Sequence, residues 1–495
     1  MEDAGMAERH PDWVCVDAAG APVETNRGAI MCLNSPYVDY LLERQLELAE
    51  RGADGFYYDE VHMPKQGCWC SFCRRLFEER TGLEMPSAAD PRDPVWQKLI
   101  EFKNATIERA FLKLRQGLHA ANPEIVMLIS GNSYPAMVEN HTSHRLYRIA
   151  DSFKTEFSLP DRIGNNRVFQ VDSSLKRPES DVRIAMGYAL ARDAADGRPA
   201  HIWCHGLINE ESAVYAAAGM IAHGCIANLD NSEGEIPNPA LFQKAVALGN
   251  RVSPALAGTR PLYWALVHFS EEARNRRLPD DRAIWKEALY PALGVFQTLL
   301  RENLPVGLIT DSQLEEGLPA DCKLLFLPTP DELSEPMRQA VAAFEKRGGR
   351  VVRQRPEWAW HDPNGGQEKA IAAFKREIIE ESAWAPVQVF GGPEKMHSMA
   401  YRAKDPGRLT VALCNEFAWV ATGKYDGIQE RLAAFSAEMI PPPCEGAMLV
   451  LRNAKRPKSV VELASGQALE FRETEGAIEI DIPAFEALAV LDVRF

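Results

Sequence analysis

The stretch Gly55-Phe-Tyr-Tyr-Asp59-Glu60 decides the fold, because a short aromatic run that ends in two carboxylates is typical of a buried strand carrying acid groups to the rim of a sheet. The segment Cys68-Trp-Cys70-Ser-Phe-Cys73 follows it closely. Three thiols at this spacing can converge on one tetrahedral zinc ion, with Zn–S bonds of about 2.3 Å. Together the two segments indicate a carboxylate-based hydrolase site braced by zinc.

The fourth zinc ligand must come from elsewhere in the chain. Cys32 is the best candidate, since it and the thiol cluster flank the same predicted strand, and Cys15 and His62 are the alternatives. A competing interpretation is a group of reduced thiols packed under a loop. A disulfide framework is not expected, because ten cysteines are few for 495 residues. We predict a structural zinc, which a closed four-thiolate site would exclude from catalysis, and no organic cofactor.

Composition bounds the remaining functions. A chain of 495 residues with 46% apolar and 25% charged residues is long enough for two or three globular domains. The net charge of -15 argues against a nucleic-acid partner, which needs clustered Lys and Arg. No apolar run is long enough to cross a membrane, and no secretory signal is visible at the start, so a cytoplasmic location is expected.

Strand-like runs alternate with helical patterns over residues 1–258. Such alternation predicts a parallel sheet with crossover helices. Each of the five runs ends in a polar residue: Asp59, Asn132, Glu156, His205 and Asp230. Because polar residues gather at the strand C-termini of a closed eight-stranded barrel, we predict an α/β fold of the (β/α)8 TIM-barrel type.

The predicted barrel is short at its N-terminus. If the strand ending at Asp59 is the fourth, three strands should precede it, and only Trp13-Val-Cys-Val16 offers one. The sequence therefore predicts a truncated barrel that lacks its first one or two βα units. Either the sequence starts at an internal Met or the barrel is incomplete by nature, and we favour the first.

Two further domains are predicted. Residues 259–362 alternate strands and helices in a doubly wound, flavodoxin-like pattern. This segment lacks a G-x-G-x-x-G or Walker loop, so we interpret it as structural or as an assembly surface. Residues 385–495 carry short alternating runs typical of an antiparallel β-sandwich.

The order of these parts resembles a known family. His10-Pro-Asp-Trp13, Asn34-Ser-Pro-Tyr37, the Asp54–Asp59 strand and Cys68 to Phe77 resemble the Cys-cluster β-galactosidases of glycoside hydrolase family 42, and still more the hypothetical glycosyl hydrolases related to them. The resemblance implies a trimerisation-type second domain, and hence a homo-oligomer, a dimer or a trimer. It also implies a set of four zinc ligands: Cys32, Cys68, Cys70 and Cys73.

This chain departs from those β-galactosidases at the expected active site. They carry Asn-Glu where this chain has Asp59-Glu60, and their seventh strand supplies a Glu nucleophile where this chain has Trp203-Cys-His205. The resemblance therefore implies neither β-galactoside specificity nor the same pair of catalytic residues.

Glycoside hydrolysis usually needs two carboxylates, one protonated to assist the leaving group and one ionised. We predict Asp59 as nucleophile or base, with Glu60 in reserve, because adjacent residues of a strand point to opposite faces. Glu156 is predicted as the general acid. Alternatively, Glu156 and Lys154, two residues away on the same face, form only a structural ion pair.

Smaller predictions concern substrate contacts. Four residues are predicted to bind sugar hydroxyls or to stack against a sugar ring: Asn132, His144, His205 and Trp69. The alternatives are a turn at Asn132, structural hydrogen bonds at the histidines and packing of the thiol loop by Trp69. Tyr57 and Tyr58 are predicted to lie in the core.

Two functional classes remain. The first is a glycoside hydrolase with a carbohydrate substrate and no catalytic metal. The second is a non-catalytic carbohydrate-binding or assembly protein on a degenerate barrel. A metal-dependent hydrolase is a weaker third hypothesis, because the chain lacks an H-x-H or H-E-x-x-H ligand motif.

Overall fold

The computed structural model describes residues 3–25, 27–59, 61, 63–64, 66–88, 90, 92–130, 143–158, 180–205, 207, 209–230, 239–278, 280–355, 358, 368–415 and 440–495, and only the backbone of 156–158, 180–183, 205, 281 and 368–371. The chain divides into two compact units. The first contains Met1–Thr155, Ala194–Pro199 and Glu271–Ile284, and the second contains Glu156–Asp193, Ala200–Ser270 and Trp285–Phe495. The predicted domains at 1–258, 259–362 and 385–495 stay a prediction.

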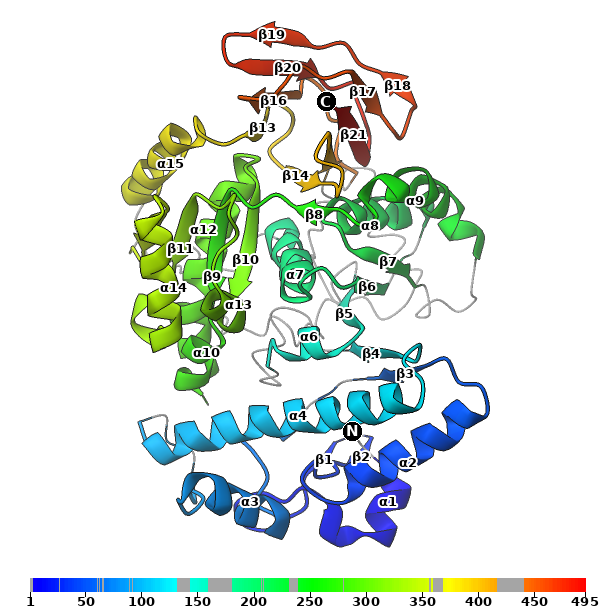
Figure 1. Cartoon of the computed structure of the whole chain (residues 1–495), viewed down its shortest axis with the longest axis vertical. Coiled ribbons are helices and arrows are strands. Elements are labelled where there is room, and N and C mark those ends of the chain that lie inside the picture. The colour runs from blue at the N-terminus through cyan, green and yellow to red at the C-terminus, as the bar shows by residue number, and fades with distance from the viewer. Residues whose placement is uncertain are drawn as a thin grey trace. The chain divides into compact units, whose positions relative to one another are not determined.

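Helix α4 (Pro94–Ala121) is the longest element of the first unit (Figure 1). Asp93 caps its start by accepting a hydrogen bond from the Val95 N–H at 2.8 Å, and a proline stands at its first position. Its apolar face packs against α2 (Tyr37–Glu50) and α3 (Ser71–Thr81). Trp13–Val16 was expected to form a strand, and this prediction is wrong: Pro11–Trp13 forms a 3-10 turn, and Val14 and Val16 make only isolated bridges.

Parallel strands follow one another in chain order. The sheet order is β3 (Gly55–Tyr58), β4 (Val126–Ser130), β5 (Ser152–Ser158), β6 (Ala200–His205) and β7 (Ile226–Leu229). The pairs β3–β4, β4–β5 and β6–β7 are parallel, as the alternation predicts. Over the described ranges β3 and β7 are the edges of an open sheet, so the five strands are confirmed and a closed barrel is not.

Asp151 fastens the start of β5 to its neighbours. Its carboxylate accepts hydrogen bonds from Arg115 Nη2 at 2.5 Å and from the Met127 N–H at 3.0 Å, and His119 Nε2 lies 3.2 Å away. Burial alone would raise the pKa of Asp151, but these hydrogen bonds and the charges of Arg115 and His119 outweigh it, and the pKa is lowered.

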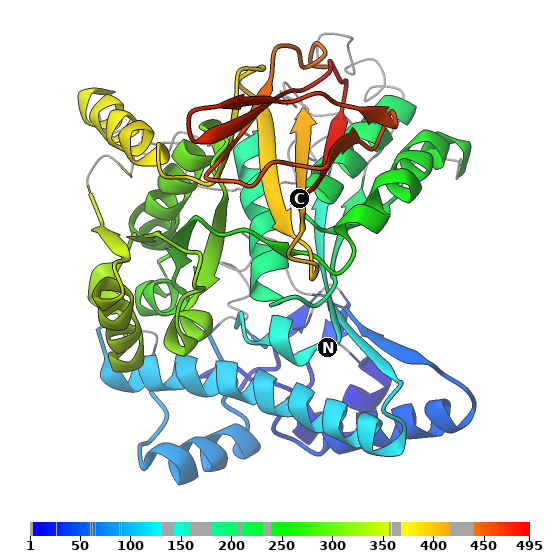
Figure 2. The same cartoon turned by 45° about the horizontal axis from the view of Figure 1, so that its top comes forward.

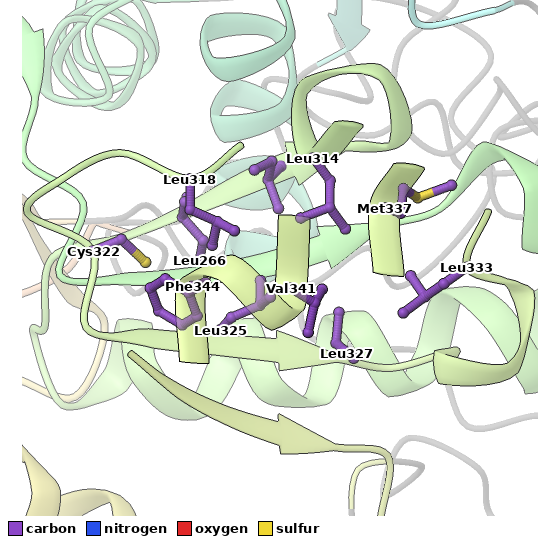
Figure 3. Packing of buried hydrophobic residues seen from close by; sticks show 11 residues of the cluster. Leu266, Leu314, Leu318, Cys322, Leu325, Leu327, Leu333, Met337, Val341 and Phe344 are labelled. Carbon is purple, nitrogen blue, oxygen red and sulfur yellow. The ribbon is translucent and has the colours of Figure 1, made fainter. Parts of the chain in front are cut away.

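The second unit contains another parallel sheet. Its order is β10 (Val306–Thr310), β9 (Ala265–Phe269), β11 (Leu324–Leu327) and β12 (Arg350–Arg353), which matches the first four positions of the flavodoxin-like order. Helix α14 (Glu335–Lys346) covers one face with the apolar cluster shown in Figure 3, in which Val341 and Phe344 meet Leu325 and Leu327. Helix α12 (Tyr290–Arg301) packs against β9 and β10. This arrangement confirms the predicted alternation.

The remaining strands form two antiparallel sheets. One has the order β13 (Val387–Phe390), β16 (Met448–Arg452), β20 (Ala477–Asp481) and β19 (Arg472–Thr474). The other has the order β18 (Gln467–Ala468), β17 (Ser459–Glu462), β21 (Leu488–Arg494), β15 (Arg408–Asn415), β14 (Met396–Arg402) and β8 (Arg260–Pro261).

Figure 2 shows the strands of residues 396–494, in orange and red, beside helix α8 (Glu210–Ala222), which packs against β15 and β21. The antiparallel pairing follows the prediction, whereas a separate sandwich domain stays a prediction. Among the described helices, none has the length and apolar character needed to span a membrane.

Candidate functional site

Four buried thiols meet in the first unit. Cys32 lies before α2, Cys68 and Cys70 lie before α3, and Cys73 lies in its first turn. The Sγ atoms of Cys32 and Cys73 are 3.4 Å apart, those of Cys32 and Cys70 are 3.5 Å apart, and all four lie within 4.8 Å of one another. Two sulfurs bound to one tetrahedral zinc would be roughly 3.8 Å apart. The predicted convergence of these four thiols is confirmed, and the group fits a metal ion.

Asn34 supports the thiol group. Its side-chain Nδ2 donates to Cys73 Sγ at 3.2 Å, its backbone N–H donates to Cys32 Sγ at 3.4 Å, and its Oδ1 accepts from Arg109 Nη2 at 3.1 Å. Such N–H donors stabilise thiolates and orient them for a metal. Cys15, the alternative ligand, is buried beside Cys32 without belonging to the group of four, and His62 lies outside the described residues.

The candidate catalytic carboxylate, Asp59, lies one residue beyond β3. Its Oδ1 accepts a hydrogen bond of 2.7 Å from the Tyr57 hydroxyl, which in turn accepts one of 2.6 Å from Lys154 Nζ. The Lys154 ammonium also lies 4.7 Å from the centroid of the Tyr57 ring, and Arg27 Nη1 is 3.8 Å from Asp59 Oδ2. A buried lysine, a tyrosine and an exposed carboxylate therefore form one hydrogen-bonded chain.

Strand register explains this chain of contacts. Tyr57 pairs with Leu128, which pairs with Ser152, and Ser130 pairs with Lys154. Side chains two residues apart in a strand share a face, and so do residues at one level of a parallel sheet. Tyr57 and Asp59 on one strand and Lys154 on another therefore point to the same side.

Tyr57 was expected to lie in the core, and this prediction is wrong because 46% of the residue is exposed. Tyr58 does lie in the core, with 6% exposed and its hydroxyl donating to Gln45 Oε1 at 2.9 Å. The signal for Tyr57 was available in the sequence, since it alternates with Tyr58 and shares the face of Asp59.

Two predicted substrate-binding residues are buried. Trp69 is 4% exposed and its indole N–H donates to the Pro86 carbonyl at 2.9 Å. His144 is 3% exposed, and its backbone N–H donates to Glu271 Oε2 at 2.9 Å. These positions suit packing of the thiol loop and structural hydrogen bonding, the alternatives given above, and roles in substrate binding stay predictions.

The other predicted residues lie partly or wholly outside the description. Glu60 and Asn132 are not among the described residues. Glu156 lies within β5 and His205 ends β6, but only the backbone is described at both positions. Glu156 therefore belongs to β5 of the sheet whose strand β3 ends just before Asp59, and the roles of the two carboxyl groups stay predictions.

Comparison with known proteins places the fold. No protein-family model and no curated protein matches the sequence. Solved structures do match: α-L-fucosidase isoenzyme 2 from Paenibacillus thiaminolyticus has a TM-score of 0.67 at 13% identity, over 99% of this chain and 86% of that one. A catalytic mutant of Gan42B, a GH42 β-galactosidase from G. stearothermophilus, has a TM-score of 0.67 at 14% identity, over 100% and 87%. A rhamnosidase from Novosphingobium sp. PP1Y has a TM-score of 0.58 at 9% identity, over 94% and 48%. The chain thus shares the fold of several glycoside hydrolases.

Proposed function

We propose that this protein is a glycoside hydrolase in which Asp59 is the nucleophile or base and Glu156 is the general acid. The observation that carries the proposal is the hydrogen-bonded chain from Lys154 through Tyr57 to Asp59 at the C-terminal end of a parallel strand. Active sites of barrel enzymes are built at this end of their strands. The likeness to a fucosidase, a β-galactosidase and a rhamnosidase supports the same reaction class.

The proposed reaction uses each carboxyl group differently. Glu156 would give its proton to the glycosidic oxygen as the bond from the anomeric carbon breaks. Asp59 would either attack that carbon, forming a glycosyl ester that water then hydrolyses, or take a proton from an attacking water. Tyr57 donates to Oδ1 of Asp59 and Arg27 Nη1 lies 3.8 Å from Oδ2, so both contacts restrict the orientation of the carboxylate.

The thiol group would hold zinc in a structural role. Four thiolates fill a tetrahedral shell, so no position remains for water or substrate. Its bonds would tie the segment before α2 to the start of α3, because Cys32 lies in the first and Cys70 and Cys73 in the second.

The test is hydrolysis of aryl β-galactosides, α-L-fucosides and α-L-rhamnosides by Asp59→Asn and Glu156→Gln variants. Each substitution is expected to lower kcat/KM by about 10³-fold or more, as removal of an acting catalytic group does. Asp54→Asn is the matched control, because Asp54 is exposed just before the start of the same strand. Azide added to an Asp59→Ala variant would give a glycosyl azide if Asp59 is the nucleophile.

Wild-type rates in folded Asp59→Asn and Glu156→Gln variants would overturn the catalytic assignment. A wild-type protein that binds such sugars and hydrolyses none of them would instead favour the non-catalytic carbohydrate-binding function.

A further inference from the structure

A second group of metal-ligating side chains is buried in the other unit. His223 follows α8, His397 lies in β14 and Cys414 lies in β15. One donor atom of each residue lies within 4.8 Å of the others. None of the three residues is more than 1% exposed. No local pattern in the sequence predicts this group, because its members are far apart along the chain.

Two of the three side chains are positioned by the sheet itself. His397 and Cys414 are direct partners in the antiparallel pairing of β14 and β15. Side chains of directly opposed residues lie on one face, with Cβ atoms roughly 4.5 to 5.5 Å apart. An imidazole and a thiol are therefore presented side by side toward α8, which packs against β15.

The backbone around His223 is fixed on both sides. Its carbonyl accepts a hydrogen bond of 3.1 Å from Arg192 Nη1, and the carbonyl of Ala222 accepts one of 2.6 Å from the Tyr401 hydroxyl. Arg192 is itself paired with Asp193 at 2.6 Å. The imidazole of His223 is thus held against the β14–β15 pair, with its ring centroid 6.0 Å from that of His397.

The ring nitrogens of His223 are buried without a hydrogen bond to the described part of the chain. Neither ring nitrogen has a hydrogen-bond partner among the described residues, although the side chain is buried. Leaving a buried polar group without a hydrogen-bond partner lowers the free energy of unfolding. A neutral imidazole has one nitrogen lone pair that a metal ion can accept.

We propose that His223, His397 and Cys414 bind one metal ion of the borderline or soft class, Zn²⁺ or Cu⁺. A thiolate with two imidazoles is a donor set that suits these ions and not Mg²⁺ or Ca²⁺. On binding, the Cys414 thiol releases its proton to solvent and the two imidazoles bind as neutral ligands. His397 Nε2 lies 3.4 Å from Arg301 Nη1, and His397 would give up this contact to offer its lone pair to the ion. Ligand atoms of one zinc lie roughly 3.3 to 3.8 Å apart, so small side-chain rotations close the site.

The position of the ion favours this proposal. The C-terminal end of a helix carries partial negative charge, and the ion would lie at the end of α8, a helix of 13 residues. It would bond the residue after α8 to two adjacent strands of the antiparallel sheet. The ion would therefore have a structural role, independent of the proposed hydrolase site.

The experiment measures metal content in the full-length protein. Purified protein is stripped with a chelator under reducing conditions, reloaded with Zn²⁺ alone or Cu⁺ alone, dialysed and analysed by mass spectrometry for metal per chain. Cys414→Ser is expected to bind one ion fewer than the wild type, and Cys73→Ser is expected to keep the ion at the new site. Cys322→Ser is the matched control, since that buried thiol belongs to neither group.

Equal metal content in folded wild-type and Cys414→Ser protein, with both ions tried, would overturn the proposal. If Cys414→Ser does not fold, X-ray absorption of the Cys73→Ser variant decides, measured at the zinc edge after loading with Zn²⁺ and at the copper edge after loading with Cu⁺. A shell of imidazole nitrogens with one sulfur supports the site, whereas an all-sulfur shell or no bound zinc or copper refutes it.

Discussion

Replacing Tyr57 with Phe tests the chain of contacts at the proposed active site. The change removes the hydroxyl that donates to Asp59 and accepts from Lys154, and leaves the ring 4.7 Å from the Lys154 ammonium. A hydrogen bond to a charged group contributes about 1.5 to 3 kcal/mol. The bond to the exposed Asp59 is screened by solvent and counts for less. We therefore expect the free energy of unfolding to fall by about 2 to 3 kcal/mol.

The assay is urea denaturation, in which the shift of the unfolding midpoint from that of the wild type is measured. Tyr58→Phe is the matched control. Tyr58 loses one neutral hydrogen bond to Gln45, which contributes about 1 kcal/mol. Tyr57→Phe should therefore cost more stability than Tyr58→Phe, although Tyr57 is the exposed residue of the two. Equal costs, or a smaller cost at Tyr57, would refute the reasoning.

Three further predictions follow from the structure. Cys73→Ser should lower both the zinc content and the melting temperature. Chelation should lower the melting temperature of the wild type by more than that of Cys73→Ser, because the variant keeps only the ion proposed at His223. Gly294→Ala should destabilise the protein by more than about 2 kcal/mol, because the added Cβ would lie 2.1 Å from the Trp358 carbonyl oxygen. An added Cβ at Gly249 would have its nearest neighbouring atom at 3.5 Å, so Gly249→Ala should instead stabilise its helix by about 0.5 to 1 kcal/mol. Thermal denaturation measures both. The pKa of Asp151 is lower in the folded than in the unfolded state, where it is about 3.9. Its carboxylate therefore stabilises the fold above the unfolded pKa, and this contribution is lost as pH falls through the folded pKa. Asp151→Asn should have a lower free energy of unfolding than the wild type at pH 7, and the difference should vanish in acid.

The periodicity of apolar residues and the spacing of the cysteines explain which features could be predicted from the sequence. The five parallel strands were identifiable because each apolar run is bounded by a helical pattern and by polar residues. The convergence of Cys68, Cys70 and Cys73 with Cys32 was identifiable because three of the thiols are close in sequence. Residues that are close in sequence can take few positions relative to one another, so such local patterns predict geometry.

The errors have physical causes. Trp13–Val16 looks like a strand because it is an apolar run with an aromatic and two β-branched residues. Pro11, however, has no N–H and a fixed φ angle, which favours the turn found at Pro11–Trp13. Tyr57 was placed in the core because it is aromatic, although its alternation with Tyr58 requires one of the two rings to face outward. The group at His223 depends on the pairing of β14 with β15, which no local pattern specifies.

Replacing Lys154 tests whether its contact with Tyr57 serves catalysis or only stabilises the fold. Burying an ammonium costs several kcal/mol, and the hydrogen bond to the Tyr57 hydroxyl is one of the contacts that offset this cost. Lys154→Met removes both the buried charge and its contacts, so it should change the free energy of unfolding by less than Tyr57→Phe, which leaves the ammonium in place. If Lys154 positions Asp59 through Tyr57, the same variant should lose about tenfold in kcat with KM unchanged, which corresponds to about 1.4 kcal/mol. A variant that loses stability and keeps full activity would show that Lys154 is a structural residue, and the proposed role of the chain of contacts in catalysis would fail with it.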